Sequence, residues 1–384
     1  MNGTAKCWSL FVLSLALAGC SMGGRQTVTP QAEIPASRVS SQPLSQSAIV
    51  ESDAGFNRSD DIIVTDQFNN RVLQIDRNHT VDWHFGDGSS VAGPNSIVGP
   101  NDAQRYGKLT LISGTGAPGG TEPTCPPPNG CVDNRVILVN REGRIVWQYG
   151  QAGVTGKGFN QLNVPVFAIR LPNHNYLITD QSNERIIEVT RDHHIVWQYG
   201  MTGIMGAGFN QLNNPNSAEL LENGHVLIAD ENNNRVIEVD RAKHIVWQYG
   251  SPSDTKTLSG AAFASRLENG NTLITDSNNS RILEVDRDKE VVWSYITNTR
   301  PGSISMPLPT RAVRLRTGNT LISDQFNDQV IEVNHAKDIV FTQGMIGMIG
   351  TGFNQLNAPY SAYLIGDFTG LTPPGKFDDR DDDE

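Results

Sequence analysis

One stretch of the sequence, from Asn223 to Gly250, returns with small edits along the chain. It recurs between Asn175 and Gly200 and again between Asn271 and Trp293. Each copy contains runs of five or six residues, rich in Val, Ile and Leu and bounded by Asn, Asp and Gly, which is the pattern of short β-strands. A repeated unit of this kind constrains the architecture of a protein before it constrains the chemistry. The repeat therefore predicts an all-β repeat protein.

Six units each predict three strands, and a further strand marked by an alanine precedes every unit except the first. A sixth strand of this kind, around Ala362, follows the last complete unit. We expect this C-terminal strand to pair with the first unit, because a closed ring leaves no exposed sheet edge. The predicted fold is an all-β, six-bladed β-propeller of four-stranded antiparallel blades, closed by the C-terminal strand.

The segment 201–240 resembles an NHL repeat. It has a glycine-rich lead-in, then Phe209-Asn210, Pro215, a strand ending at Asp230 and the run Asn233-Asn234-Arg235. The resemblance covers about residues 60–366 and implies six blades. A second signature, Glu-Val-Asp-Arg followed by Ile-Val-Trp, is similar to arylsulfotransferase-like and quinoprotein-like propellers. NHL propellers include binding scaffolds, lyases and signalling modules, so the resemblance implies a fold more than an activity.

The N-terminus has the pattern of an export signal. A short polar start precedes an apolar run, which ends in Leu17-Ala18-Gly19-Cys20 and resembles the bacterial lipobox. The resemblance implies cleavage after residue 19 and a lipid anchor on Cys20, facing the periplasm from the outer membrane; the alternative is an ordinary secretory signal with a chance cysteine. We expect a signal peptide over 1–19, a flexible tether over 20–48, the propeller over 49–368 and a disordered acidic tail over 369–384.

Two cysteines remain beyond the signal and Cys20. Cys125 and Cys131 enclose three prolines, an asparagine and a glycine, a segment that favours a tight turn. We expect a disulfide between them in an oxidising compartment. A metal pair is the alternative, although no further ligand lies near them in the sequence.

Residues that recur in every blade are best explained by packing. The aromatic side chains of the outer strands are expected between neighbouring sheets, and the aspartates that end the second strands are expected to bind turn N–H groups and an arginine five positions later. These structural residues are Trp83, Trp147, Trp197, Trp247, Trp293, Asp66, Asp180, Asp230, Asp276 and Asp324. A ring of carboxylates that binds a cation is the alternative for the aspartates. The recurring Gly-Phe-Asn-Gln-Leu-Asn motif is interpreted as loop packing.

Specific chemistry is expected where the repeat is interrupted. The second unit has Gly114 in place of the aspartate and an insertion from Thr115 to Cys131, a candidate binding loop or a tolerated surface insertion. The innermost strands carry a second set of candidates. Their charged residues are Arg105, Arg170, Arg266, Arg311, Arg314, Asp102 and Glu219. Such arginines could line a channel that binds carboxylate, sulfate or phosphate groups, or their stems could cover strand edges.

Composition excludes several classes of function. The net charge is −11, of which the run from Asp378 to Glu384 supplies −5, so nucleic acid is not expected as a partner. No nucleophile motif, metal-ligand spacing or cofactor motif is present, and the histidines fall mainly in turns. We expect a monomeric scaffold that binds an envelope protein or glycan, with no cofactor and no metal. An enzyme that acts on a small anionic substrate in the central funnel is the main alternative, and a quinone-cofactor protein is a third.

Overall fold

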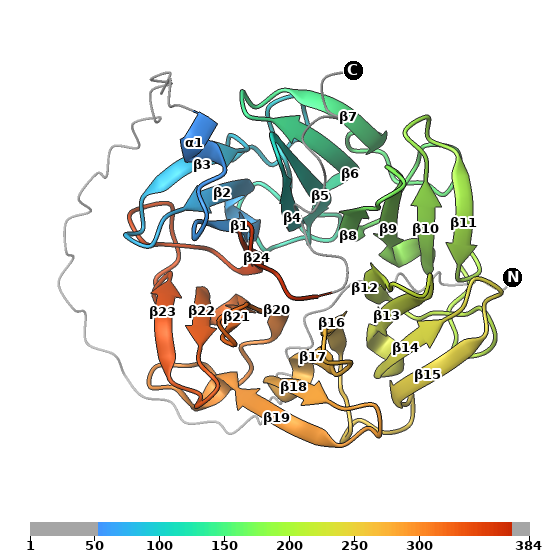
Figure 1. The fold of residues 1–384 in the computed structure, drawn as a ribbon. Coiled ribbons are helices and arrows are strands. Elements are labelled where there is room, and N and C mark those ends of the chain that lie inside the picture. The colour runs from blue at the N-terminus through green and yellow to red at the C-terminus, as the bar shows by residue number, and fades with distance from the viewer. Residues whose placement is uncertain (1–52, 371–384) are drawn as a thin grey trace, which may run out of the picture. The chain divides into compact units, whose positions relative to one another are not determined.

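The computed structural model describes residues 53–370, which form six four-stranded sheets arranged in a ring (Figure 1). This is the predicted six-bladed propeller. The expected signal peptide, Cys20, tether and the acidic run from residue 378 lie outside the described residues. Within the described range, no helix is long and apolar enough to cross a membrane.

We number the blades 1 to 6 and call the strands of each blade A to D from the ring axis outwards. Blade 1 consists of β24 (Pro359–Leu364), β1 (Ile62–Asp66), β2 (Arg71–Ile75) and β3 (Val81–Phe85). Blade 2 consists of β4 (Pro100–Tyr106), β5 (Leu109–Ala117), β6 (Cys131–Asn140) and β7 (Ile145–Gly150). Blade 3 consists of β8 (Pro165–Arg170), β9 (Tyr176–Asp180), β10 (Arg185–Val189) and β11 (Ile195–Tyr199).

Blade 4 consists of β12 (Pro215–Leu220), β13 (Val226–Asp230), β14 (Arg235–Val239) and β15 (Ile245–Gly250). Blade 5 consists of β16 (Ala261–Arg266), β17 (Thr272–Asp276), β18 (Arg281–Val285) and β19 (Val291–Ile296). Blade 6 consists of β20 (Pro309–Arg314), β21 (Thr320–Asp324), β22 (Gln329–Val333) and β23 (Ile339–Gln343). The helical segments are short: α1 (Asp53–Phe56), η1 (Gln67–Asn69), η2 (Gln181–Asn183), η3 (Glu231–Asn233), η4 (Ser277–Asn279), η5 (Thr297–Thr299) and η6 (Gln325–Asn327).

The C-terminal strand closes the ring as predicted. β24 pairs antiparallel with β1, with Ile62 opposite Leu364 and Val64 opposite Ala362. The hydroxyls of Thr65 and Ser361 lie 3.2 Å apart in the same pair. Blade 1 is therefore built from both ends of the described chain, which joins the blue and red ends of the ring in Figure 1.

Burial falls from the inner strands to the outer ones. The B strands other than β5 are buried along their whole length, whereas D strands such as β15 begin with exposed residues. The tryptophans of the D strands reach the next blade: Trp147 Nε1 donates to Arg191 O at 2.9 Å, and Trp83 and Trp293 make the same bond to Arg141 and His335. Because both faces of each sheet pack against a neighbouring blade, most of the hydrophobic core lies between blades.

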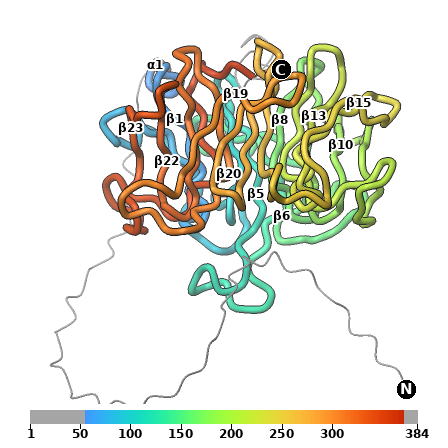
Figure 2. Tube along the Cα trace, turned by 90° about the horizontal axis from the view of Figure 1, so that it is seen from below, coloured from blue at the N-terminus to red at the C-terminus, as the bar shows by residue number. Residues whose placement is uncertain are grey.

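The antiparallel order of the strands gives the ring two different faces. We call the face with the B–C turns and the D–A connections the loop face, and the face with the A–B and C–D turns the turn face. The insertion in blade 2 projects from the loop face, while α1 lies on the opposite side (Figure 2). Gln74 Nε2, at the turn-face end of β2, donates to Gly55 O at 2.7 Å. The described chain therefore begins on the turn face.

Candidate functional site

The aspartates that end the B strands are buried, and each accepts several hydrogen bonds. We call such an aspartate, together with the arginine that pairs with it, a hub. Asp180 is fully buried, and its Oδ2 accepts hydrogen bonds from Arg185 Nε and Asn183 Nδ2, each at 2.7 Å. Its Oδ1 accepts the backbone N–H of Asn163 in the preceding D–A connection at 2.7 Å. Asp66, Asp230 and Asp276 make equivalent bonds. Burial raises the pKa of Asp180 to about 6, although Arg185 acts to lower it. With these donors in place, each hub joins a B–C turn to the D–A connection beside it.

Blade 2 keeps this hub but takes the carboxylate from the facing strand. Gly114 occupies the aspartate position, and Asp133 accepts from Arg135 Nε at 2.6 Å and from the N–H of Val98 at 2.8 Å. A Cβ on residue 114 would lie 2.5 Å from an Ile97 carbon and 2.7 Å from the Asp133 carboxyl carbon. Gly114 therefore leaves room for the Asp133 carboxylate, which takes the role that the B-strand aspartate has in the other blades. Blade 2 thus keeps its hub. Sequence reasoning missed the role of Asp133.

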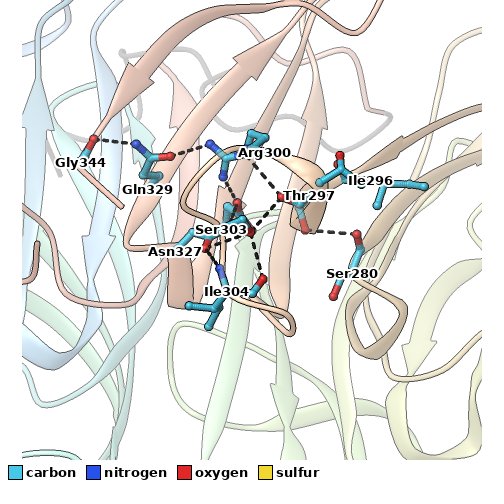
Figure 3. Close-up of polar contacts among 11 residues, drawn as sticks. Ser280, Ile296, Thr297, Arg300, Ser303, Ile304, Asn327, Gln329 and Gly344 are labelled. Atoms are coloured by element: carbon cyan, nitrogen blue, oxygen red, sulfur yellow. Dashed lines mark hydrogen bonds and ion pairs between the residues drawn. The ribbon is translucent and has the colours of Figure 1, made fainter. Parts of the chain in front are cut away.

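Blade 6 takes the cation from another segment. Gln329 stands where the other blades have an arginine, and Arg300, just after η5, reaches over to pair with Asp324. Arg300 Nη1 also donates to Gln329 Oε1 at 2.6 Å, and Gln329 Nε2 donates to Gly344 O at 3.0 Å (Figure 3). The recurring hubs thus have ready structural partners in all six blades.

The charged residues of the ring axis pair with one another. Arg311 on β20 is fully buried, its Nη2 lies 3.4 Å from Asp102 Oδ1 on β4, and its guanidinium lies over the rings of Phe167 and Phe263 at 4.9 and 4.5 Å. Tyr363 Oη donates to the same Asp102 oxygen at 2.9 Å. Burial raises the pKa of Asp102 to about 6 against the lowering effect of Arg311. These contacts tie blades 6, 1 and 2 across the axis.

Three other predicted arginines lie between blades. Arg266 Nη2 contacts Glu238 of the preceding blade at 3.2 Å, and Arg314 Nη2 contacts Glu284 at 2.9 Å. Arg105 Nη1 donates to Phe56 O, and the guanidinium carbon of Arg105 lies 3.4 Å from the centroid of the Phe56 ring. Arg170 is buried beside His174, with an Nη2 to Nδ1 distance of 3.1 Å. The structure therefore brings Arg311 and Asp102 together on the axis and directs Arg105, Arg266 and Arg314 towards neighbouring blades.

The axis is filled at several levels. Near the loop face, Asn216 Nδ2 donates to Tyr360 Oη on the opposite blade and to Glu231 Oε2, both at 2.9 Å. Burial raises the pKa of Glu231 to about 7. Towards the turn face, Phe368 lines a small axial cavity with Gln104, Glu219 and other residues, and that cavity has a volume of about 10 Å³. This is room for about one water molecule. Within residues 53–370, no group of three or more His, Cys, Asp or Glu residues is placed to hold a metal.

The end of the described chain packs beside this axial cavity. Thr369 N and Oγ1 both donate to Arg314 O, and Gly370 forms a bridge with Leu267. The ordered contacts of the ring thus extend to residue 370, two residues beyond the predicted end of the propeller. Described residues from all six blades contact one another across the axis or line the cavity around Phe368.

The insertion of blade 2 is an ordered loop with the predicted disulfide. Cys125 and Cys131 are bonded, with their Cα atoms 5.1 Å apart, and Cys125 is fully buried. Glu122 accepts hydrogen bonds from Asn70 Nδ2 at 2.8 Å and from Ser90 Oγ at 2.9 Å. The loop is therefore anchored to blade 1 and to its D–A connection.

Large apolar side chains are exposed on the D–A connections. Phe159, Phe209 and Phe353 are 68%, 66% and 73% exposed. Further exposed residues of these connections are Val91, Val154, Ile204, Met205, Ile304, Met306, Met348 and Ile349. The Gly-Phe-Asn-Gln motif packs through its polar members, since Asn160 Oδ1 accepts from Gly150 N at 2.8 Å and Gln161 Oε1 from Gly158 N at 3.2 Å. The interpretation as loop packing therefore describes Asn and Gln but overlooks the phenylalanine, whose recurrence in three connections was the available signal.

Comparison with known proteins supports the class of fold. A solved structure of a protein of unknown function from Bacteroides caccae is 13% identical, covers 79% of this chain and 98% of its own, and has a TM-score of 0.54. A virginiamycin B lyase from Staphylococcus aureus is 12% identical over 66% of this chain and 75% of its own, with a TM-score of 0.43. A chain of a nidogen/laminin complex is 11% identical over 73% and 92%, with a TM-score of 0.48. No family model and no curated protein matches the chain. The protein is a six-bladed β-propeller, and the similarity at these identities concerns the fold alone.

Proposed function

We propose that this propeller is an envelope-anchored binding protein that holds a partner protein on its loop face. The observation that carries the proposal is the display of Phe159, Phe209 and Phe353, each about two-thirds exposed, on three of the D–A connections. Each of these connections groups the exposed ring with at least one further exposed Val, Ile or Met side chain, and exposed apolar groups of this kind are typical of interaction surfaces. Aromatic residues and Met are also enriched at protein interfaces.

A protein partner fits these residues better than a glycan does. Six of the eight further exposed side chains of the connections are Ile or Met, with no polar atom suited to sugar hydroxyls. The described chain begins on the turn face, so an anchor attached through the N-terminal segment leaves the loop face accessible. Lipidation at Cys20 and the position at the outer membrane remain part of the proposal.

The alternative of an enzyme in the central funnel has less support. Arg311 and Asp102 pair with each other, and the axial cavity holds only about one water molecule. A substrate would have to open the contact between Asn216 and Tyr360 or displace Phe368 to enter the axis. A small molecule that co-purifies with the protein would favour this alternative.

The proposal is tested by changing the displayed rings together. The triple variant Phe159→Asn, Phe209→Asn and Phe353→Asn should keep its melting transition but lose a partner retained by wild type in cross-linked purification from intact cells. A matched control changes Val196, Val246 and Val292 to Thr, since these residues of the D strands are also about half exposed. Equal recovery of the partner by both triple variants would contradict the proposal.

A further inference from the structure

The seam between blades 2 and 3, like that between blades 1 and 2, which has Gln74 at the same position, lacks a C-strand glutamate that is present in the other four blades. In blades 3 to 6, the C strand carries a glutamate whose carboxylate receives cations from the following blade. Arg241 Nη1 contacts Glu188 at 2.8 Å, and Arg77 Nη1 contacts Glu332 at 2.6 Å. In blade 2 this position is Leu138. The arginine that corresponds to Arg241 at this seam is Arg191, where Leu138 stands in place of the glutamate. Arg170, which corresponds to Arg266, contacts His174 and also lines the same region.

A groove of about 650 Å³ opens at this point. Leu138, Arg170 and Arg191 line it, together with Lys108, Arg141 and the ring of Trp147. Its acidic lining residue, Glu142, lies 3.8 Å from Arg144 in an exposed pair. Neither Lys108 nor Arg191 has an ion pair to any carboxylate of the described chain, and both are exposed. The groove thus concentrates positive charge in a protein of net charge −11.

We infer that this groove binds a run of carboxylates and that its occupant is the acidic segment from Asp378 to Glu384 of the same chain. The segment contains six acidic residues and one arginine, so its charge complements that of the groove. Lys108, Arg141 and Arg191 lie in A–B and C–D turns or beside them, which places the groove on the turn face. The described chain ends on that same face.

The intervening chain is long enough to reach the groove. Phe368 lines the axial cavity together with Ile169, and the next residue of β8, Arg170, lines the groove. Seven residues lie between Gly370 and Asp378, and the eight Cα-to-Cα steps that join these two residues span up to about 26 Å when extended. A tethered segment also acts at an effective concentration in the millimolar range, so a modest intrinsic affinity is enough for occupancy.

The test uses the full chain with its acidic segment neutralised. This variant, which we call the neutralised protein, carries Asn in place of Asp378, Asp379, Asp381, Asp382 and Asp383, and Gln in place of Glu384. A fluorescent peptide of the sequence 377–384 should bind this protein, and its Kd should rise steeply with added salt, because exposed charges are screened. The wild-type chain should bind the peptide at least about tenfold more weakly, because its own segment competes.

Two further variants locate the binding site. In the neutralised background, Leu138→Glu restores the residue of the repeat and should weaken peptide binding about tenfold, because the new carboxylate competes for Arg170 and Arg191. Arg241→Ala, at a seam that keeps its glutamate, should leave the Kd unchanged. If Leu138→Glu does not fold, the exposed pair Lys108→Ala and Arg191→Ala should give the same weakening.

Several results would overturn the inference. They are equal binding of the peptide to wild type and to the neutralised protein, undiminished binding to the Leu138→Glu protein, or no binding at all. Inorganic polyphosphate that binds wild type as tightly as the neutralised chain would show a groove open to external anions. That result would contradict occupancy by the segment of the same chain.

Discussion

At the scale of single residues, Asp133 and Arg300 replace hub residues that their blades lack. Asp133 pairs with Arg135 from the same strand, while Arg300 reaches Asp324 from a D–A connection. The requirement is physical: the buried carboxylate orients turn N–H groups, and it must have a cation beside it because an unpaired buried charge is costly. Different residues can therefore meet the same need.

Removal of the hub aspartate should destabilise the protein equally whether that aspartate lies on the B strand or, as in blade 2, on the C strand. We expect Asp133→Ala and Asp180→Ala each to lower the free energy of unfolding by about 3 kcal/mol, since each leaves a buried arginine without its partner. Urea unfolding of the two variants measures this. The exposed Asp87→Ala serves as a control and should cause no measurable change. An Asp133→Ala protein as stable as the control would show that Asp133 is not the hub of blade 2.

Asp102 should make stability depend on pH. Its pKa is raised to about 6 in the folded protein, from 3.8. A carboxyl with a raised folded pKa binds more protons in the folded state, so its contribution is fully present below about pH 4 and is lost as the pH rises to about 6. Over this pH range the contribution of Asp102 to the free energy of unfolding falls by roughly 3 kcal/mol. Unfolding of wild type and Asp102→Asn at pH 4.5 and 7 should differ by an amount of this order; an identical pH dependence in both would contradict the assignment.

At the scale of elements, β24 carries the closure of the ring. It pairs with β1, and its Tyr363 donates to Asp102 of blade 2. The following residues pack against β20 and Leu267. β24 and the residues that follow it thus join blade 1 to blades 2, 5 and 6, and the loss of this segment should affect the whole ring rather than one sheet.

Truncation tests this directly. A chain that ends at residue 358 should lose the cooperative melting transition of the ring, because β1 becomes an open edge. A chain that ends at Gly370 should retain the transition. Equal melting temperatures for the two truncated chains would contradict closure by β24.

The sequence predicted the fold well and the sites less well, for a physical reason. Strand periodicity, the recurring alanine and the displaced sixth A strand depend on local sequence, and they were sufficient for the ring and its closure. The pairing of Arg300 with Asp324 and the bond from Val98 N–H to Asp133 depend on contacts between segments that the sequence does not place side by side. The absent glutamate at Leu138 was visible when the blades are aligned, but its meaning required the positions of Arg170 and Arg191.

At the scale of the whole molecule, the two faces differ in chemistry. The loop face carries the disulfide-closed insertion, while the turn face carries the basic groove and the first described residues. The exposed phenylalanines belong to the D–A connections, and their rings lie beside histidines of the C–D turns. The axis between them is filled by paired and aromatic side chains. This arrangement suits a rigid disc that binds a partner on one face.

The insertion should contribute to partner binding without supporting the ring. We expect replacement of residues 118–130 by a short glycine linker, with Cys131→Ser, to leave the melting temperature nearly unchanged and to weaken recovery of the partner.

The protein should also sediment as a monomer, because the displayed rings are proposed to bind a different protein. A dimer that dissociates in the Phe159, Phe209 and Phe353 variant would identify a second copy of the chain as the occupant.

Site-specific photo-cross-linking in intact cells tests the central claim most directly. A photoreactive residue in place of Phe209, on the loop face, should give a discrete adduct with one partner protein. The same residue in place of Val292, on an outer strand, or Glu222, in the A–B turn of the turn face, should give none. Adducts of the same partner from all three positions, or none from Phe209, would contradict a loop face that binds a protein.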